Sequence, residues 1–167
     1  TVTVNGVDYA TNFLVKTGTG ATLSFPQQAI YFSGGAAGSV TASFATLPSV
    51  TFGGDMTIEV WVKPDGSQAN FSRIVDFGAN ATPIPAGGSP ADNVWLGFNF
   101  ATSRFEFEVF VGTLSKGQLI STSTYNDGWH HLAVTLSGST ATMYVDGVNI
   151  GATTFQGTPA NILRTSN

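Results

Sequence analysis

The sequence predicts an all-β protein, folded as an antiparallel β-sandwich of the jelly-roll kind. Apolar and polar residues alternate with a period of two in run after run, which is typical of strands that have one buried face. Turn-forming residues separate these runs, and no segment shows the 3.6-residue period of an amphipathic helix. With 167 residues, of which 42% are hydrophobic, the chain is long enough to bury one sizeable core.

The composition excludes several classes of function. Charged residues make up only 10% of the chain and the formal net charge is −4, so no basic surface exists to neutralise phosphates. The absence of cysteine excludes disulfides, thiol catalysis and thiolate metal sites. Apolar runs are far shorter than the roughly 20 residues of a membrane helix. We therefore expect neither nucleic acid nor a membrane as a partner.

The predicted strands follow one another along the chain with little between them. Asn5 and Gly6 tolerate the positive φ of a tight turn and predict a hairpin of residues 1–4 and 7–9. Asp146 and Gly147, between two alternating runs, are the strongest hairpin signal. The remaining strands are predicted at 29–32, 39–44, 56–63, 71–77, 93–100, 104–112, 118–124, 129–137, 140–145 and 148–155.

One segment interrupts this succession of predicted strands. Residues 78–92 hold three prolines and show no alternation, so they predict a long loop. Residues 1–25 are set apart by composition and are interpreted as an N-terminal hairpin and linker, or as the tail of a preceding module. Residues 26–167 are interpreted as the sandwich domain.

The outward positions of the predicted strands carry tryptophan beside glutamate, asparagine and histidine. Flat aromatic rings between hydrogen-bonding side chains are what sugar recognition needs, because a pyranose has an apolar C–H face and a rim of hydroxyl groups. The alternative is that a second layer or a neighbouring domain covers this face. The candidate sugar-binding residues are Trp61, Trp95, Tyr144, Glu59, Asn99, Glu106, Glu108 and His131.

Three blocks of sequence resemble a known family. Residues 56–64 (MTIEVWVKP), 128–135 (GWHHLAVT) and 143–148 (MYVDGV) are similar, in order and spacing, to laminin-G-like domains of the concanavalin A-like lectin/glucanase superfamily. The resemblance extends over about residues 26–167 and implies a concanavalin A-like jelly roll. Because the superfamily includes lectins, adhesion modules and glucanases, the fold alone implies no single activity.

The sequence departs from the family in two places. The opening strand resembles residues 29–34, but Ser33 stands where the family commonly has an aspartate that helps to hold calcium. The closing strands that the resemblance implies after residues 161–164 are missing from the sequence. We therefore expect these strands to come from residues beyond this segment or from a strand donated by another chain.

The resemblance also frames the question of catalysis. Retaining glucanases of the superfamily place two glutamates four residues apart on one strand face, with an aspartate between them. Glu106 and Glu108 share a face but lie two residues apart, and Phe110 stands where a third carboxylate is implied. We therefore expect no enzymatic activity, and a glycoside hydrolase is the less favoured alternative.

Calcium is the one cofactor that the residues allow. Asp92 and Asn93 lie at the end of the predicted long loop and offer oxygen ligands, which calcium prefers. We predict that they join another rim loop to hold one calcium ion. His130 and His131 point to opposite faces of a strand, so they do not chelate one metal together.

The sequence thus predicts a non-catalytic carbohydrate-binding or adhesion module of a larger protein, exposed outside the cell or on a cell or virion surface. Its expected partners are a glycan or glycoprotein surface and the neighbouring domains or subunits. The alternative is a structural assembly module, such as a capsid, fibre or filament component, without a sugar site. Few charges and a mean hydropathy of +0.16 fit a surface made for permanent contacts.

Overall fold

The computed structural model describes residues 54–64, 70–78, 93–111 and 114–157, together with the backbone of 2–4, 7–9 and 45–46. The strands predicted at 29–32 and 39–44, and all but the first residue of the predicted 78–92 loop, lie outside the described residues.

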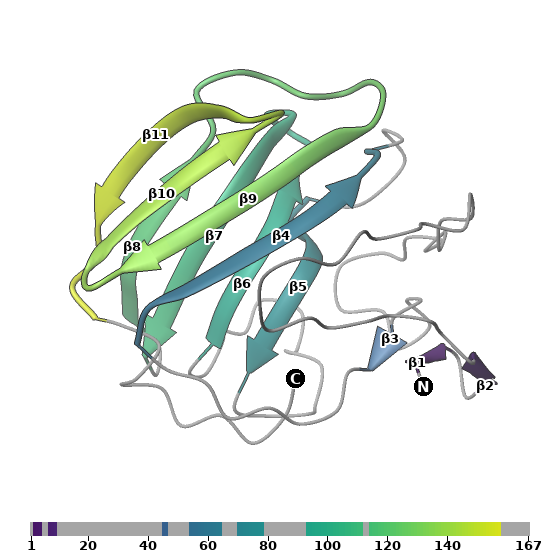
Figure 1. Ribbon diagram of the computed structural model, residues 1–167, viewed down its shortest axis with the longest axis horizontal. Coiled ribbons are helices and arrows are strands. Elements are labelled where there is room, and N and C mark those ends of the chain that lie inside the picture. Colours follow the sequence, from purple (N-terminus) through teal and green to yellow (C-terminus); the bar gives the residue numbers. More distant parts are fainter. Residues whose placement is uncertain are drawn as a thin grey trace, which may run out of the picture.

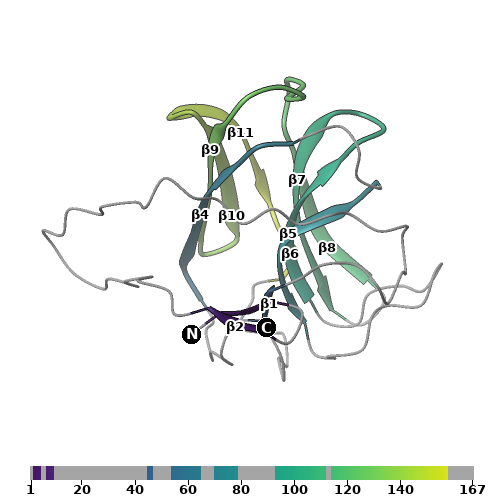
Figure 2. The same cartoon turned by 90° about the vertical axis from the view of Figure 1, so that its right-hand side faces the viewer.

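Two four-stranded antiparallel sheets pack face to face and form a sandwich (Figures 1 and 2). The first, here called the β4 sheet, has the order β11 (Val148–Thr154), β10 (Thr140–Val145), β9 (His130–Ser137) and β4 (Met56–Val62). The second, the β7 sheet, has the order β5 (Ser72–Gly78), β6 (Asn93–Asn99), β7 (Arg104–Val111) and β8 (Leu114–Ile120). The described residues contain no helix, and so none that could cross a membrane. The predicted all-β sandwich is confirmed.

A small separate sheet contains the N-terminal hairpin. Strands β1 (Val2–Val4) and β2 (Val7–Tyr9) pair antiparallel, as the Asn-Gly turn predicts. Strand β1 also pairs with β3 (Ala45–Thr46), which belongs to the segment interpreted as the sandwich domain. This ladder links the first residues of the chain to the part that follows residue 25.

Strand β8 begins four residues earlier than the alternation predicts. Its ladder with β7 starts at Leu114 opposite Val111 and contains a bulge between Val109 and Phe110. The bulge brings Leu119 opposite Phe107, so that this leucine enters the core. The strand ends after Ile120, although the backbone N–H of the buried Ser121 still donates to the Phe105 carbonyl oxygen at 2.9 Å.

The core lies between the sheets and consists of the inward positions that the alternation predicts. At its centre, the Phe105 ring packs against Phe98 at 5.1 Å and Phe107 packs against Phe155 at 5.7 Å, both edge to face. Gly117 permits this last contact, because a Cβ there would lie 2.4 Å from the Phe155 ring. The buried apolar residues of this core are Val94, Leu96, Phe98, Phe105, Phe107, Val109, Leu119, Leu132, Val134, Leu136, Ala141, Met143, Val145 and Phe155.

A histidine ties the loop before β9 to the turn between β10 and β11. His130 Nδ1 lies 2.8 Å from Asp146 Oδ2, and its Nε2 lies 2.7 Å from the carbonyl oxygen of Asp127. A carboxylate and a carbonyl only accept hydrogen bonds, so the imidazole N–H is the donor. The bond from His130, and a second from the backbone N–H of His131, lower the pKa of Asp146. Asp146 and Gly147 both have positive φ, as expected for the hairpin turn predicted at these two residues.

Burial predicts how two leucines will differ. Leu132 is fully buried between Val60 and Val145, whereas Leu114 on β8 is 63% exposed. We expect Leu132→Ala to lower the free energy of unfolding by about 2–5 kcal/mol, because it leaves a cavity in the core. Leu114→Ala should change it by less than about 1 kcal/mol. Urea denaturation of both variants measures the difference, and equal losses would contradict the core described here.

Candidate functional site

The structure divides the predicted sugar-binding residues into two groups. The β4 sheet carries Glu59, Trp61, His131 and Tyr144. The β7 sheet carries Trp95, Asn99, Glu106 and Glu108. All eight point away from the inner side of their own sheet, and the two sheets pack through their inner sides. The two groups therefore lie on opposite surfaces of the sandwich and do not form a single site (Figure 2).

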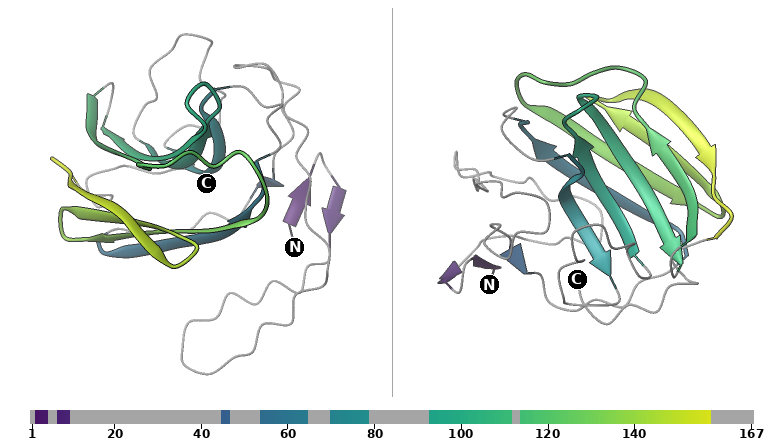
Figure 3. Two further views of the ribbon diagram at one scale, coloured as in Figure 1. Left: turned by 90° about the horizontal axis from the view of Figure 1, so that it is seen from above. Right: turned by 180° about the vertical axis from the view of Figure 1, so that it is seen from behind.

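The outer surface of the β7 sheet contains a hollow of about 370 Å³. Its floor follows the strand register, since Trp95 on β6 and Gln118 on β8 are the cross-strand partners of Glu108 on β7. Figure 3 (right) shows this sheet from its outer side. The residues that line the hollow are Phe71, Arg73, Trp95, Glu108, Phe110 and Gln118. The hollow combines aromatic rings with charged and amide groups, and of the eight predicted sugar-binding residues it contains Trp95 and Glu108.

Trp95 forms the floor of this hollow and offers no free ring face. Its six-membered ring lies against Gly97, where a Cβ would come within 2.8 Å of it and within 2.5 Å of the Ser72 carbonyl oxygen. The Arg73 guanidinium lies 3.9 Å from the ring centroid, a cation–π contact. Trp95 is therefore only 2% exposed. The predicted stacking of a sugar on Trp95 requires Arg73 to move away.

Arg73 is surrounded by carboxylates. Its Nε lies 3.2 Å from Asp76 Oδ2, while Asp76 Oδ1 accepts a hydrogen bond from Asn93 at 3.4 Å. Burial raises the pKa of Asp76, and the attraction of Arg73 and the Asn93 bond partly offset this rise. Burial also lowers the pKa of Arg73, against the attraction of Asp76, Glu108 and Glu106.

The two glutamates of β7 are buried beside this arginine. Glu106 is 3% exposed; its Oε1 accepts a 3.0 Å bond from Asn99, and its Oε2 has no partner. Glu108 is 8% exposed and accepts a 2.7 Å bond from Ser115 Oγ. Burial raises the pKa of both carboxyl groups. The Trp95 indole lies near enough to Glu108 to hold that pKa down in part, although its Nε1 makes no hydrogen bond of good geometry.

Part of this site does not follow from the sequence alone. The alternation predicts a strand from Phe71 onward, but β5 begins at Ser72, and Phe71 lies in the preceding turn at a φ of 61°. It is 52% exposed and stands edge-on to Trp95, with ring centroids 6.4 Å apart. Strict alternation also separates Arg73 from Asp76, and only the bulge between Arg73 and Val75 brings them to one surface.

The outer surface of the β4 sheet has a different character. Trp61 is 56% exposed and its ring lies 5.2 Å from that of His131. The Nε2 atom of His131 lies 3.9 Å from Glu59 Oε2. Tyr144 is half-buried on β10, opposite Ala133. Trp129, two residues before His131, is 52% exposed. This surface therefore has exposed aromatic rings and few polar side chains that are held in hydrogen bonds or ion pairs.

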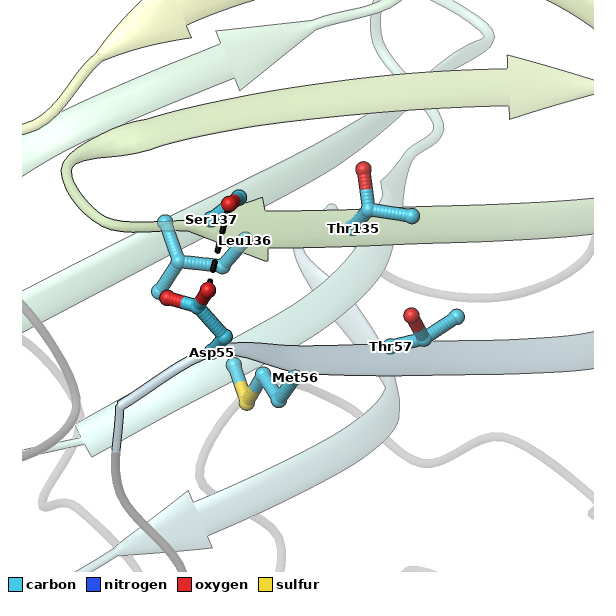
Figure 4. A pocket seen from close by; sticks show the side chains of 6 residues that line it. All are labelled: Asp55, Met56, Thr57, Thr135, Leu136 and Ser137. Carbon is cyan, nitrogen blue, oxygen red and sulfur yellow. Dashed lines mark hydrogen bonds between the residues drawn. The ribbon is translucent and has the colours of Figure 1, made fainter. Parts of the chain in front are cut away.

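A second hollow, of about 400 Å³, lies where β4 begins and β9 ends (Figure 4). Asp55 Oδ1 accepts a 2.6 Å bond from the Gly138 backbone N–H, and its Oδ2 accepts a 3.2 Å bond from Ser137 Oγ. Thr57 and Thr135 are paired across the two strands. The charge of Asp55 is thus used to hold the β9–β10 turn, and we assign this hollow a structural role.

Of the two predicted calcium ligands, the structure describes only Asn93. Asp92 lies outside the described residues. Asn93 is 2% exposed and donates to Asp76, whose carboxylate is already paired with Arg73. In the described part of the chain, no three or more acidic, histidine or cysteine side chains come together to hold a metal. Asn93 and Asp76 therefore do not fit a calcium ion by themselves.

Two of three comparisons with known proteins found a match. Residues 32–167 match the family described as the concanavalin A-like lectin/glucanases superfamily. A β-glucanase from Bacillus licheniformis has a similar solved structure, with 21% sequence identity and a TM-score of 0.46 over 75% of this chain. The chain spans only about half, 54%, of that protein. No curated protein matches the sequence.

The burial of Glu106 predicts a pH dependence of stability. A carboxyl group whose pKa is raised by folding binds more protons in the folded state, so stability falls as pH rises from about 4.3 through the folded pKa. We expect Glu106→Gln to weaken this fall and to raise the free energy of unfolding at pH 7 by roughly 1 kcal/mol, because it removes a buried charge. Urea denaturation of the wild-type chain and the variant between pH 4 and pH 8 measures the free energy of unfolding at each pH. Glu59→Gln, on the opposite surface, is the matched control, and equal effects would contradict the assignment.

Proposed function

Because the chain belongs to the concanavalin A-like lectin/glucanases superfamily, we propose that it is a non-catalytic carbohydrate-binding module of a larger protein, exposed outside the cell or on a cell or virion surface. The supporting observation is the hollow of the β7 sheet. It places a half-exposed aromatic ring, Phe71, beside the Glu108 carboxylate and the Gln118 amide.

The chemistry of these groups matches the two sides of a sugar ring. An aromatic ring contacts the apolar C–H face of a pyranose, while carboxylates and amides bond its hydroxyl groups. Glu108 and Gln118 are direct neighbours across β7 and β8, so one sugar can reach both. The volume of about 370 Å³ is within the range of small-molecule sites. Binding is shallow and weak at one site, and repetition of the module on a surface strengthens it.

The arrangement of the glutamates supports binding without hydrolysis. A retaining glycosidase needs two carboxyl groups that flank the scissile bond, both within reach of the substrate. Only Glu108 lines the hollow; Glu106 is 3% exposed and accepts a hydrogen bond from Asn99, so a sugar that reaches Glu108 meets one carboxyl group and not two. Phe110 follows on the same surface in place of a third carboxylate.

The test is binding of the chain to a broad panel of glycans and polysaccharides, with and without a chelator. We expect neutral glycans to bind, no reducing sugar to be released, and Gln118→Ala to weaken binding about fivefold to tenfold through the loss of hydrogen bonds. Gln118 is exposed, so this substitution leaves the fold intact.

Trp61→Ala is the control on the opposite sheet and should leave glycan binding unchanged. A loss of binding in Trp61→Ala alone would move the site to the β4 sheet. A blank panel from a folded protein would refute the carbohydrate proposal. Binding that disappears with the chelator would support the predicted calcium ion.

Two exposed tryptophans, Trp61 on β4 and Trp129 just before β9, favour a second function, assembly with a neighbouring subunit. Trp61 and Trp129 are 56% and 52% exposed. Tryptophan is enriched at protein interfaces, where a few large rings supply most of the binding energy. With only 10% charged residues in the chain, such a surface has little to oppose close packing.

Assembly predicts concentration-dependent association of the chain. We expect light scattering at increasing protein concentration to detect multimers, and Trp61→Ala with Trp129→Ala to weaken association at least tenfold, as expected for interface residues worth more than about 1 kcal/mol each. Phe71→Gly, on the other sheet, serves as the control. A wild-type chain that stays monomeric at all concentrations would exclude self-assembly through this surface.

A further inference from the structure

The backbone of Phe71 is unusual for its residue type. Among the described residues, three that are not glycine have positive φ: Phe71 at 61°, Ser103 at 55° and Asp146 at 53°. Asp146 is a hairpin-turn residue whose carboxylate bonds His130 and His131, and Ser103 is in a turn whose carbonyl accepts a bond from Tyr125. Small polar residues tolerate this conformation, whereas a bulky side chain does so rarely.

Burial does not explain why phenylalanine occupies this position. The side chain is 52% exposed, so much of its apolar surface remains in water. Among the described residues, its one ring contact is the perpendicular approach to Trp95, which is already covered by Arg73. A strained backbone that holds an exposed aromatic ring at the edge of a hollow points to a role in binding.

We infer that Phe71 is the aromatic platform of the hollow and that it selects an uncharged pyranoside, one that presents an unbroken C–H face to the ring. This inference rests on the proposed carbohydrate function. The left-handed turn sets where the Phe71 side chain leaves the backbone at the edge of the hollow. Trp95 supports the platform from below and does not itself contact the sugar.

The charges around the hollow give the ligand its class. Glu106 and Glu108 are buried beside Arg73, whose guanidinium is paired with Asp76. Arg104 lies on the same side of β7, opposite Asn99 at the far end of the ladder. A carboxylate or sulfate on the sugar would approach two carboxylates whose neighbouring cation is already committed, and like charges repel in a partly buried site.

The experiment compares Phe71→Gly and Phe71→Asn with Phe71→Tyr. Glycine and asparagine accept the positive φ but remove the ring, whereas tyrosine keeps it. For the neutral glycans that bind the wild-type chain, we expect the first two variants to weaken binding about tenfold and tyrosine to retain it. The melting temperature of Phe71→Gly should be unchanged or higher, which a merely structural role would not give. Leu114→Ala, exposed on the same sheet, is the control.

A second measurement tests the ligand class. Methyl β-glucoside and methyl β-galactoside are compared with their uronic acid counterparts, which differ only at C6, by saturation-transfer NMR with irradiation of the aromatic protons. Of the two neutral sugars, we test the one whose structure is most similar to the glycans that bind in the panel. We expect saturation to reach the protons on one face of its ring. Its acidic counterpart should receive at least fivefold less saturation.

The outcomes separate the two levels of the proposal. Wild-type binding that persists in Phe71→Gly overturns the platform role and leaves the carbohydrate function in place. Equal binding of neutral and acidic sugars overturns the ligand class. A folded chain that binds no glycan refutes the proposed function and, with it, this inference.

Discussion

Each strand of this protein must direct alternate residues into the layer between the two sheets, and this constraint positions every group on the outer surfaces. Phe105 and Phe107 enter the core from β7, so Glu106 and Glu108 have to point away from it. The same alternation in β4 buries Val60 against the core and leaves Trp61 outside. The candidate site therefore consists of the outward residues of the same strands that supply the core. A one-residue slip in the register of β7 would turn its core residues outward and its site residues inward.

That constraint explains how far the sequence could predict the site. Alternation distinguishes inward from outward positions within a strand, and it did so correctly for β4, β6, β7 and β9. It contains no information about which strands share a sheet. Trp61 and Trp95 have the same local pattern, yet β4 pairs with β9 while β6 pairs with β5 and β7. Residues expected at one site are consequently divided between two surfaces.

Local departures from regular structure account for what the sequence did not predict. A bulge in β5 carries Arg73 and Asp76 to the same side of the sheet, and a bulge in β7 shifts the register of β8. The left-handed turn at Phe71 follows from no rule of residue preference, because phenylalanine is a poor choice for it. These irregularities all lie at or beside the hollow. The regular strands form the sandwich, and the two bulges and the turn at Phe71 determine which side chains line the hollow.

The energetics of the two surfaces support different roles for them. On the β7 sheet, burial raises the pKa of Asp76, Glu106 and Glu108, which means that their charged forms are destabilised in the folded protein. A surface under selection for stability alone would carry neutral or exposed side chains at these positions, since a buried charge is costly without complete pairing. Buried carboxylates, a committed arginine and a strained aromatic turn are together typical of a site that prepares its groups for a ligand. The β4 sheet lacks such buried charges among the described residues of its outer surface, and its exposed tryptophans fit a broad, flat partner. The proposed ligand site and the proposed packing surface are therefore compatible with each other, because the sandwich core separates the two sheets' outer surfaces.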